Sequence, residues 1–117
     1  MMRFTLAFLA ALGAAMPASA DVIWGDDGGC ARLAGLPPQT DMVFLLYPDR
    51  VERWESACMI SAVTRLSGNG QRIEVTCSGE GETWRDAYIL GAERPDGTVP
   101  VRLDDLPDPI TYIRPCQ

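Results

Sequence analysis

The amino-acid sequence predicts an all-β domain: a small antiparallel meander closed as a barrel or sandwich, disulfide-stapled, with one short N-terminal helix. Three observations support this prediction. Short runs of alternating apolar and polar residues recur, turn-forming residues separate them roughly every 8 to 15 residues, and four cysteines are available for cross-links. Because so short a chain buries only a small core, cross-links are expected to supply much of its stability.

The first twenty residues have the composition of a secretory signal peptide. Arg3 gives a positive start, residues 4–15 are almost entirely apolar, and residues 17–20 end in an Ala-x-Ala pattern. The apolar run is too short to span a bilayer. We therefore expect a signal peptide over residues 1–20, a single β domain over residues 21–117, and a periplasmic or secreted location.

All four cysteines, Cys30, Cys58, Cys77 and Cys116, follow the expected cleavage point. An even number of cysteines in an oxidising compartment predicts two disulfides, for which three connectivities exist. We favour Cys58 with Cys77 and Cys30 with Cys116, because Ser67-Gly68-Asn69-Gly70 lies midway between the inner pair and would form a hairpin turn. A two-residue loop at Ser67-Gly68 would place Cys58 directly opposite Cys77. A four-thiolate metal site is the alternative, but no Cys-x-x-Cys spacing supports it.

The first expected elements are a helix and a core strand. Residues 30–35 are predicted to form one or two helical turns, which begin at Asp26 or Asp27 and end at Gly35. Residues 42–47 form a continuous apolar run with the length and composition of a strand, and they are expected to be the main core strand.

Residues 50–66 allow two interpretations. Asp49 and Glu52 resemble a capping box, and the apolar residues that follow have near-helical spacing, which indicates one helix. Residues 59–66 also alternate as a strand does. Residues 71–77 alternate cleanly and need an antiparallel neighbour across the Gly-rich turn, so we favour a hairpin.

Further strands are expected over residues 83–90, 98–103 and 110–113, with an irregular segment over residues 104–109. The residues expected to face the core are Ile73, Val75, Cys77, Trp84, Tyr88, Leu90, Val99, Val101 and Leu103.

The three tryptophans, Trp24, Trp54 and Trp84, fall at equal intervals, and the segments that start at Glu52 and Glu82 are similar. A duplicated strand unit or coincidence explains this similarity. Both interpretations place Trp54 and Trp84 near equivalent strand starts.

The charged residues exclude several kinds of site. The chain has no His and all ten basic residues are Arg, which excludes Ser-His-Asp and Cys-His catalysis, lysine Schiff bases, His-ligated zinc and the Walker lysine. The formal net charge is −6, and it becomes −7 without Arg3, since 9 Arg and 16 acidic residues then remain. Phosphate backbones and anionic lipids repel such a protein. We expect a monomer without cofactor that binds no nucleic acid and no membrane, and whose partner is a basic envelope or host protein, or a glycan.

Acidic loops offer no clear metal site. Neither the group of Asp104, Asp105 and Asp108 nor the pair Asp26 and Asp27 has the residue order of an EF-hand loop. We therefore expect solvated acids here rather than calcium ligands.

The candidate binding residues are Trp54, Trp84, Arg85, Glu80 and Glu82. Trp and Arg are frequent in interface hot spots. Hydrolysis would have to use Glu80 and Glu82, which lie in an acidic turn that is poorly suited to building an apolar pocket. We therefore expect no catalytic residue and favour a non-catalytic binding module over a structural accessory protein or a carboxylate hydrolase.

The arrangement of the tryptophans distinguishes these hypotheses. A groove with two facing carboxyls would favour the hydrolase, a flat exposed patch of Trp and Arg the binding module, and two buried tryptophans the accessory protein.

The segments around the inner cysteines resemble a group of small exported proteins of alphaproteobacteria. The resemblance spans residues 41–90 and rests on a Glu-x-x-Cys strand, here Glu55 to Cys58, and a Cys-x-Gly-Glu-Gly turn that begins at Cys77. It implies strands rather than a helix over residues 50–66, and no particular activity.

In size, expected export, disulfides, expected barrel and acidity the chain is also distantly similar to the periplasmic inhibitors of C-type lysozyme. The binding loop of that family reads Ser-Gly-x-x-Tyr. Ser67-Gly68 and Ser78-Gly79 match its first two positions, while Gln71 and Glu82 stand where the tyrosine would be.

Overall fold

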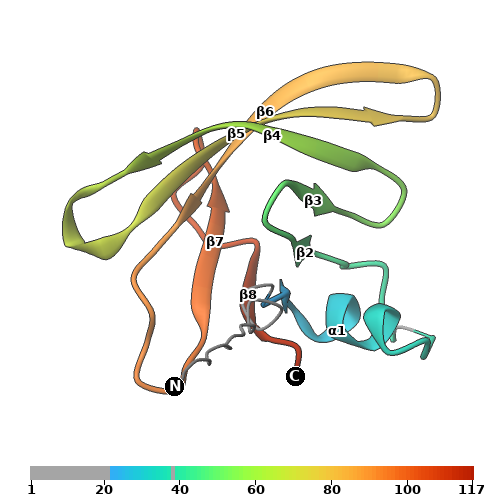
Figure 1. Ribbon diagram of the computed structural model, residues 1–117, viewed down its shortest axis with the longest axis horizontal. Coiled ribbons are helices and arrows are strands. Elements are labelled where there is room, and N and C mark those ends of the chain that lie inside the picture. Colours follow the sequence, from blue (N-terminus) through green and yellow to red (C-terminus); the bar gives the residue numbers. More distant parts are fainter. Residues whose placement is uncertain (1–21, 38) are drawn as a thin grey trace, which may run out of the picture.

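The computed structural model describes residues 22–37 and 39–117, and the expected signal peptide over residues 1–20 lies outside these residues. The described chain forms a closed antiparallel barrel in which each strand pairs with the next and β8 pairs with β1 (Figure 1). The elements are β1 (Trp24–Gly25), α1 (Asp27–Leu33), β2 (Leu45–Leu46), β3 (Arg50–Glu52), β4 (Ala57–Arg65), β5 (Gln71–Gly79), β6 (Glu82–Leu90), β7 (Val99–Leu103) and β8 (Thr111–Pro115). The predicted all-β class and the short helix are confirmed, and the closed form is a barrel.

The strands differ greatly in length. β4, β5 and β6 have nine residues each, whereas β1 and β2 have two and β3 has three. Along β4, only the first residues, 57–59, pair with β3, and along β6, only the last residues, 88–90, pair with β7. The β5–β6 hairpin therefore projects beyond β7 at one end of the barrel, and the β4–β5 hairpin projects beyond β3 at the other (Figure 1).

Residues 50–66 form no helix: they contain β3, a turn over residues 53–56 and β4, which pairs with β5 in the predicted hairpin so that Cys58 lies opposite Cys77. The expected two-residue loop at Ser67-Gly68 is wrong. Residues 66–70 form the loop, in which Ser67–Asn69 make a single 3-10 turn and Leu66 N–H donates to Gly70 O at 2.8 Å. The register shifts by one residue between Ile60 and Ala62. This bulge offsets the longer loop, so the two cysteines still face each other.

The barrel interior is filled by the inward-facing residues of nearly every strand. The core consists of Phe44, Val51, Cys58, Ile73, Val75, Cys77, Tyr88, Leu90, Val99, Val101 and Ile113, with Leu103 packed against it. The predicted inward face is therefore correct for β5 and β7.

Trp84 departs from the prediction that it packs in the core. It faces the same side of the sheet as Cys77, its register partner, but its side chain is 37 % exposed. The reason is its position on the projecting end of β6, where no part of β7 covers it. Trp54 lies in the turn between β3 and β4, so the two tryptophans do not occupy equivalent strand starts.

The predicted core strand over residues 42–47 is only partly a strand. Val43, Phe44 and Leu45 are fully buried, but the sheet pairing is limited to Leu45–Leu46. The backbone of Phe44 bonds instead to Asp26, whose N–H donates to Phe44 O at 3.1 Å and whose Oδ1 accepts from Phe44 N at 3.0 Å.

Both disulfides have the pairing that the hairpin argument favoured. Cys58 is bonded to Cys77 across neighbouring strands, and Cys30 on α1 is bonded to Cys116 near the C-terminus. Two disulfides in a domain of this size are typical of an oxidising, non-cytoplasmic compartment. Among the described residues, no helix has the length and apolar character needed to cross a membrane.

Candidate functional site

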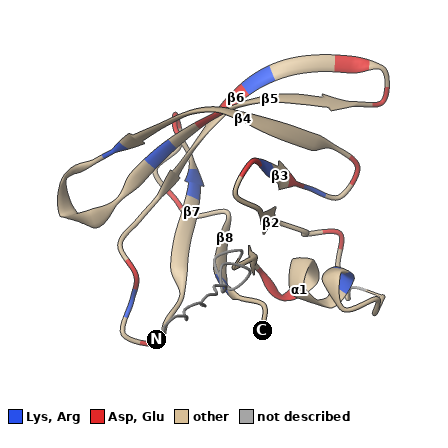
Figure 2. Ribbon diagram, in the orientation of Figure 1, with Lys and Arg blue, Asp and Glu red and all other residues tan. Residues whose placement is uncertain are grey.

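A cleft of about 380 Å³ lies under the projecting β5–β6 hairpin, between this hairpin and the turn that joins β3 to β4. We call it the acidic aromatic cleft. Its lining residues are Arg53, Trp54, Glu55, Ser56, Cys58, Cys77, Gly79, Glu80, Glu82, Trp84, Asp86 and Tyr88. Figure 2 shows acidic residues in both of the connections that face each other across it.

The two tryptophans supply exposed aromatic surface. The side chains of Trp54 and Trp84 are 45 % and 37 % exposed. The Trp84 indole N–H donates to Asp86 Oδ2 at 3.0 Å, which orients the ring along β6. Large half-exposed aromatic rings in a hollow are well placed to contact a ligand.

Four carboxylates line the cleft: Glu55, Glu80, Glu82 and Asp86. A hydrogen bond between the carboxyls of Glu55 and Glu80, together with the repulsion between their charges, raises the pKa of Glu55. A hydrogen bond with Trp54 acts in the opposite direction and more weakly. The two acids therefore lie close enough to compete for one proton.

Arg53 is the single cation in the lining, and the barrel holds its guanidinium firmly. Arg53 Nε donates to Val43 O at 3.1 Å, and Nη1 donates to Tyr88 Oη at 2.7 Å. The Tyr88 ring is buried and meets Phe44 edge to face, with ring centroids 5.2 Å apart. Burial raises the pKa of Tyr88, so its hydroxyl stays protonated at neutral pH. Four carboxylates against one engaged arginine leave the cleft with a net negative charge.

The backbone around the cleft is tightly constrained. Glu80 and Gly81 form the tip of the β5–β6 hairpin with φ values of 52° and 80°. Gly79 lies so close to the opposite turn that a Cβ atom there would approach Glu55 O to 2.7 Å. Arg32, from α1, donates through Nη1 to the carbonyl oxygens of Arg53 and Trp54 at 3.0 and 3.4 Å. The hairpin therefore packs directly against the turn at Gly79, and Arg32 ties that turn to α1.

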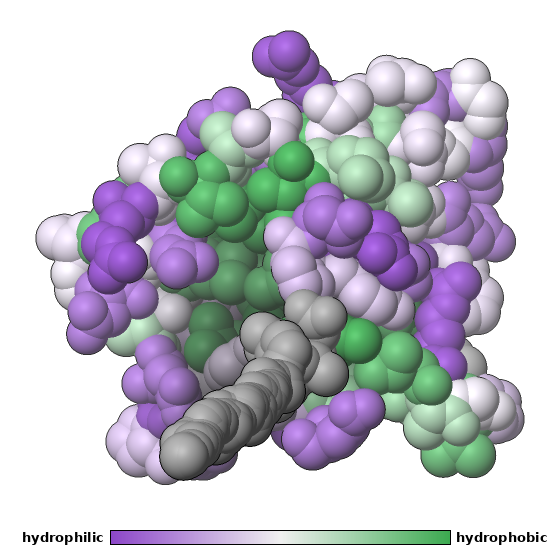
Figure 3. All heavy atoms as spheres, in the orientation of Figure 1, coloured by the Kyte–Doolittle hydropathy of each residue, from purple (hydrophilic) through white to green (hydrophobic). Residues whose placement is uncertain are grey.

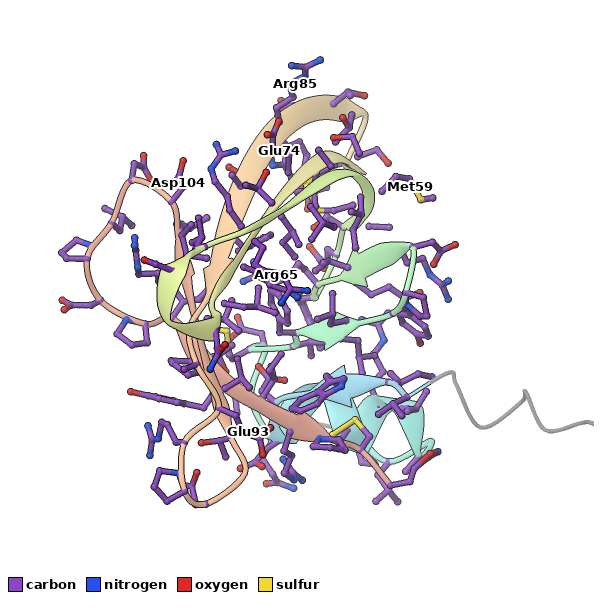
Figure 4. All side chains as sticks on the ribbon, turned by 60° about the vertical axis from the view of Figure 1, so that its left-hand side comes forward. Met59, Arg65, Glu74, Arg85, Glu93 and Asp104 are labelled. Carbon is purple, nitrogen blue, oxygen red and sulfur yellow. A yellow bond between two sulfur atoms is a disulfide. The ribbon has the colours of Figure 1, made fainter. Side chains whose placement is uncertain are left out.

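Four of the five predicted binding residues, Trp54, Trp84, Glu80 and Glu82, line this one cleft. Arg85 does not, because it alternates to the opposite face of β6. It projects from the upper end of the molecule, near Glu74 and Asp104 (Figure 4).

Glu55, Asp86 and the hydrogen bond between Arg53 and Tyr88 were not predicted from the sequence. The only sequence signal for Glu55 is that it directly follows Trp54. The only signal for Asp86 is that it lies two residues after Trp84, which places both side chains on the same face of a strand.

A second concavity, of about 440 Å³, lies on the outer face of the sheet and includes Arg85. Three of its charged residues form a linked ion-pair group: Arg72 pairs with Glu74 at 2.8 Å and with Asp104 at 3.0 Å. Within residues 22–37 and 39–117, no group of three or more Cys, Asp or Glu side chains is arranged to hold a metal ion.

No family model, curated protein or solved structure matches the chain.

Proposed function

We propose that this protein is a non-catalytic binding module, exported to the periplasm or secreted, that holds a cationic side chain of a basic partner protein in the acidic aromatic cleft. One observation carries the proposal: two half-exposed tryptophans and four carboxylates line one hollow whose single arginine is already bonded to Val43 and Tyr88. Aromatic faces attract Lys and Arg through cation–π interactions. The carboxylates add charge attraction and bidentate hydrogen bonds for Arg.

The conformation of Glu80 supports a role in binding. A non-glycine residue with φ near +50° is uncommon, and Asn or Asp is normally found in such a turn. Glutamate at this position costs stability and extends a longer carboxylate into the cleft. Unfavourable backbone conformations often occur at functional sites.

The overall charge also supports a basic partner. The chain has 16 acidic and 10 basic residues, and long-range attraction between opposite charges accelerates association. A neutral glycan could stack on the tryptophans, but it would leave the charge of the cleft uncompensated.

The surroundings of the carboxyls favour binding over hydrolysis. The cleft is concave and contains facing acids, which is the arrangement expected of a hydrolase. However, the side chains of Glu55 and Glu80 are exposed to solvent, whereas the general acid of a glycosidase is held in an apolar pocket that keeps it protonated.

Peptide titration tests the proposal. Three alanine-rich peptides that differ only at a central Arg, Lys or Gln are titrated into the oxidised protein by calorimetry at low salt. We expect Arg to bind best, Lys more weakly and Gln not measurably, with affinity falling as salt rises. Trp54→Ala and Trp84→Ala should each weaken Arg binding by at least about fivefold, the loss of one cation–π contact of roughly 1 kcal/mol.

Tyr112→Ala is the matched control, since Tyr112 is an exposed aromatic residue outside the cleft. Its loss should leave binding unchanged. Equal binding of the Arg and Gln peptides would overturn the proposal, as would binding of a chitin trisaccharide that depends on Trp54 and Trp84 while the Arg peptide shows none.

A further inference from the structure

The opposite end of the barrel contains a separate hollow of about 320 Å³ with mainly apolar walls. Trp24, Leu46, Val99 and Ile113 line it from β1, β2, β7 and β8, and Gln71 and Glu93 lie among its polar lining residues. In Figure 3, hydrophobic atoms line a hollow below the β4–β5 hairpin. We call this space the barrel mouth.

The barrel mouth continues into the core. Ile113 and Val99 are buried at its base, while Trp24 and Leu46 are only partly buried and pack against the core cluster. Eight-stranded barrels either fill their interior with side chains or hold one small ligand there. Here the two-residue strands β1 and β2 are too short to close the end beneath the projecting β4–β5 hairpin.

The charge beside the mouth selects the kind of ligand. Among the described residues, Glu93 takes part in no ion pair. Its neighbour Arg94 pairs with Asp96 at 3.4 Å and stacks on Tyr112 with its guanidinium carbon 4.5 Å from the ring centroid. The carboxylate of Glu93 is therefore the charge available beside the apolar hollow.

We propose that the barrel mouth binds a small amphiphilic amine, with its hydrocarbon part among Trp24, Leu46 and Val99 and its ammonium group beside Glu93. The volume lies at the small end of ligand pockets. Burial of the hydrocarbon part supplies the affinity, and the ion pair with Glu93 supplies the preference for an amine.

This site is independent of the acidic aromatic cleft. Figure 4 shows Glu93 at the lower end of the molecule and Arg85 at the upper end, on the hairpin that covers the cleft. The buried pair of Phe44 and Tyr88 lies at the cleft end of the core. The two sites share no lining residue.

Dye displacement tests the proposal. The oxidised protein is loaded with N-phenyl-1-naphthylamine, a neutral dye that fluoresces in apolar surroundings, and titrated with octylamine, octanol or octanoate. We expect displacement in that order of potency. Glu93→Gln should weaken octylamine about two- to fivefold, which is the effect of one exposed ion pair, and leave octanol unchanged.

Two variants locate the site. Leu46→Trp fills the mouth from its half-buried wall and should abolish dye binding, whereas Trp84→Ala alters the cleft and should leave it unchanged. The native circular dichroism spectrum of each variant confirms folding. If Leu46→Trp unfolds the chain, protection of Trp24 fluorescence from acrylamide by octylamine, in a Trp54→Phe/Trp84→Phe background, reports the same contact.

The proposal is overturned if octylamine, octanol and octanoate displace the dye equally, if Trp84→Ala rather than Leu46→Trp removes dye binding, or if no dye binds. None of these outcomes bears on whether Arg peptides bind the cleft, so the two proposals fail separately.

Discussion

Glu80 shows how one residue connects backbone strain to charge. It occupies a turn position with φ of 52° that suits Asn, and the same turn places its carboxyl against Glu55. Asn at this position would make the turn more stable. Glu80 therefore lowers the stability of the turn while it places a carboxylate in the cleft, and substitution of Glu80 can measure both effects.

Glu80→Asn should stabilise the protein and weaken binding. Asn adopts the left-handed conformation more readily, so we expect a gain of roughly 0.5 to 1 kcal/mol in the free energy of unfolding, measured by urea denaturation. The Arg peptide should bind more weakly, because one cleft charge is lost. Gly81→Ala is the opposite control, since its φ of 80° makes any side chain unfavourable there. A Glu80→Asn protein that loses stability would show that the turn is not strained.

Glu55 should make binding depend on pH. Its raised pKa means that it ionises at a higher pH than a free glutamate, whose pKa is 4.5. The Arg peptide should therefore bind more tightly as the pH rises from about 4 through this raised pKa. The folded state also holds the proton more tightly than the unfolded chain does, so this group favours folding at low pH and less so as the pH rises.

Calorimetric titration of the Arg peptide between about pH 4 and pH 8 measures this dependence. In the Glu55→Gln variant, the affinity for the Arg peptide should change less with pH, because the group that ionises is gone. Tighter binding on acidification would contradict the assignment.

At the scale of elements, one buried carboxylate anchors the start of α1 to two other parts of the chain. Asp26 Oδ1 accepts from Gly29 N at 2.7 Å as the helix N-cap and from Phe44 N at 3.0 Å, while Oδ2 accepts from Thr111 Oγ1 at 2.9 Å. Gly28 and Gly29 let the helix lie directly against the carbonyls of residues 42 and 44. One side chain therefore joins α1, the segment before β2, and β8.

Asp26→Ala should lower the free energy of unfolding by about 2 to 4 kcal/mol, because two buried N–H groups lose their acceptor. Asp27→Ala is the matched control: its side chain is 98 % exposed and pairs only with Arg114. That change should cost less than about 0.5 kcal/mol. Chemical denaturation of both variants measures the difference, and equal losses would refute the capping role.

The strands show which local features can be predicted. Residues 71–77 alternate strictly, and this period of two placed Ile73, Val75 and Cys77 inward without any knowledge of neighbours. The bulge between Ile60 and Ala62 could not be predicted, because it depends on how the loop at residues 66–70 closes against β5. The core position predicted for Trp84 is wrong for a similar reason. The alternation of residues predicts which face of β6 Trp84 occupies, but it does not predict that the neighbouring β7 ends before it reaches Trp84.

At the scale of the whole molecule, the two disulfides stabilise different things. Cys58–Cys77 joins adjacent strands within one hairpin and closes a short loop, with a sequence separation of 19. Cys30–Cys116 ties α1 to the C-terminal end over a separation of 86. In the chain-entropy model the longer loop contributes more, because it restricts the unfolded chain more strongly.

Replacing both cysteines of the outer pair by Ser should therefore cost roughly 4 to 5 kcal/mol, and replacing the inner pair roughly 3 kcal/mol. Urea denaturation of the two double variants, with the reduced wild type as the lower limit, checks this order. A reductant that leaves the wild-type midpoint unchanged would show that neither bond supports the fold.

The sequence by itself determined the strand class, the inward faces, the preferred disulfide pairing and the acidic character, because each depends on period, turn residues or composition along the chain. Only the tertiary structure decided that the hairpins project from opposite ends of a barrel. The acidic aromatic cleft and the barrel mouth arise where long strands extend past short ones. Glu55 and Glu80 line one hollow, and Trp24 and Val99 line the other, although the members of each pair are distant in the chain. No local pattern in the sequence encodes such an arrangement.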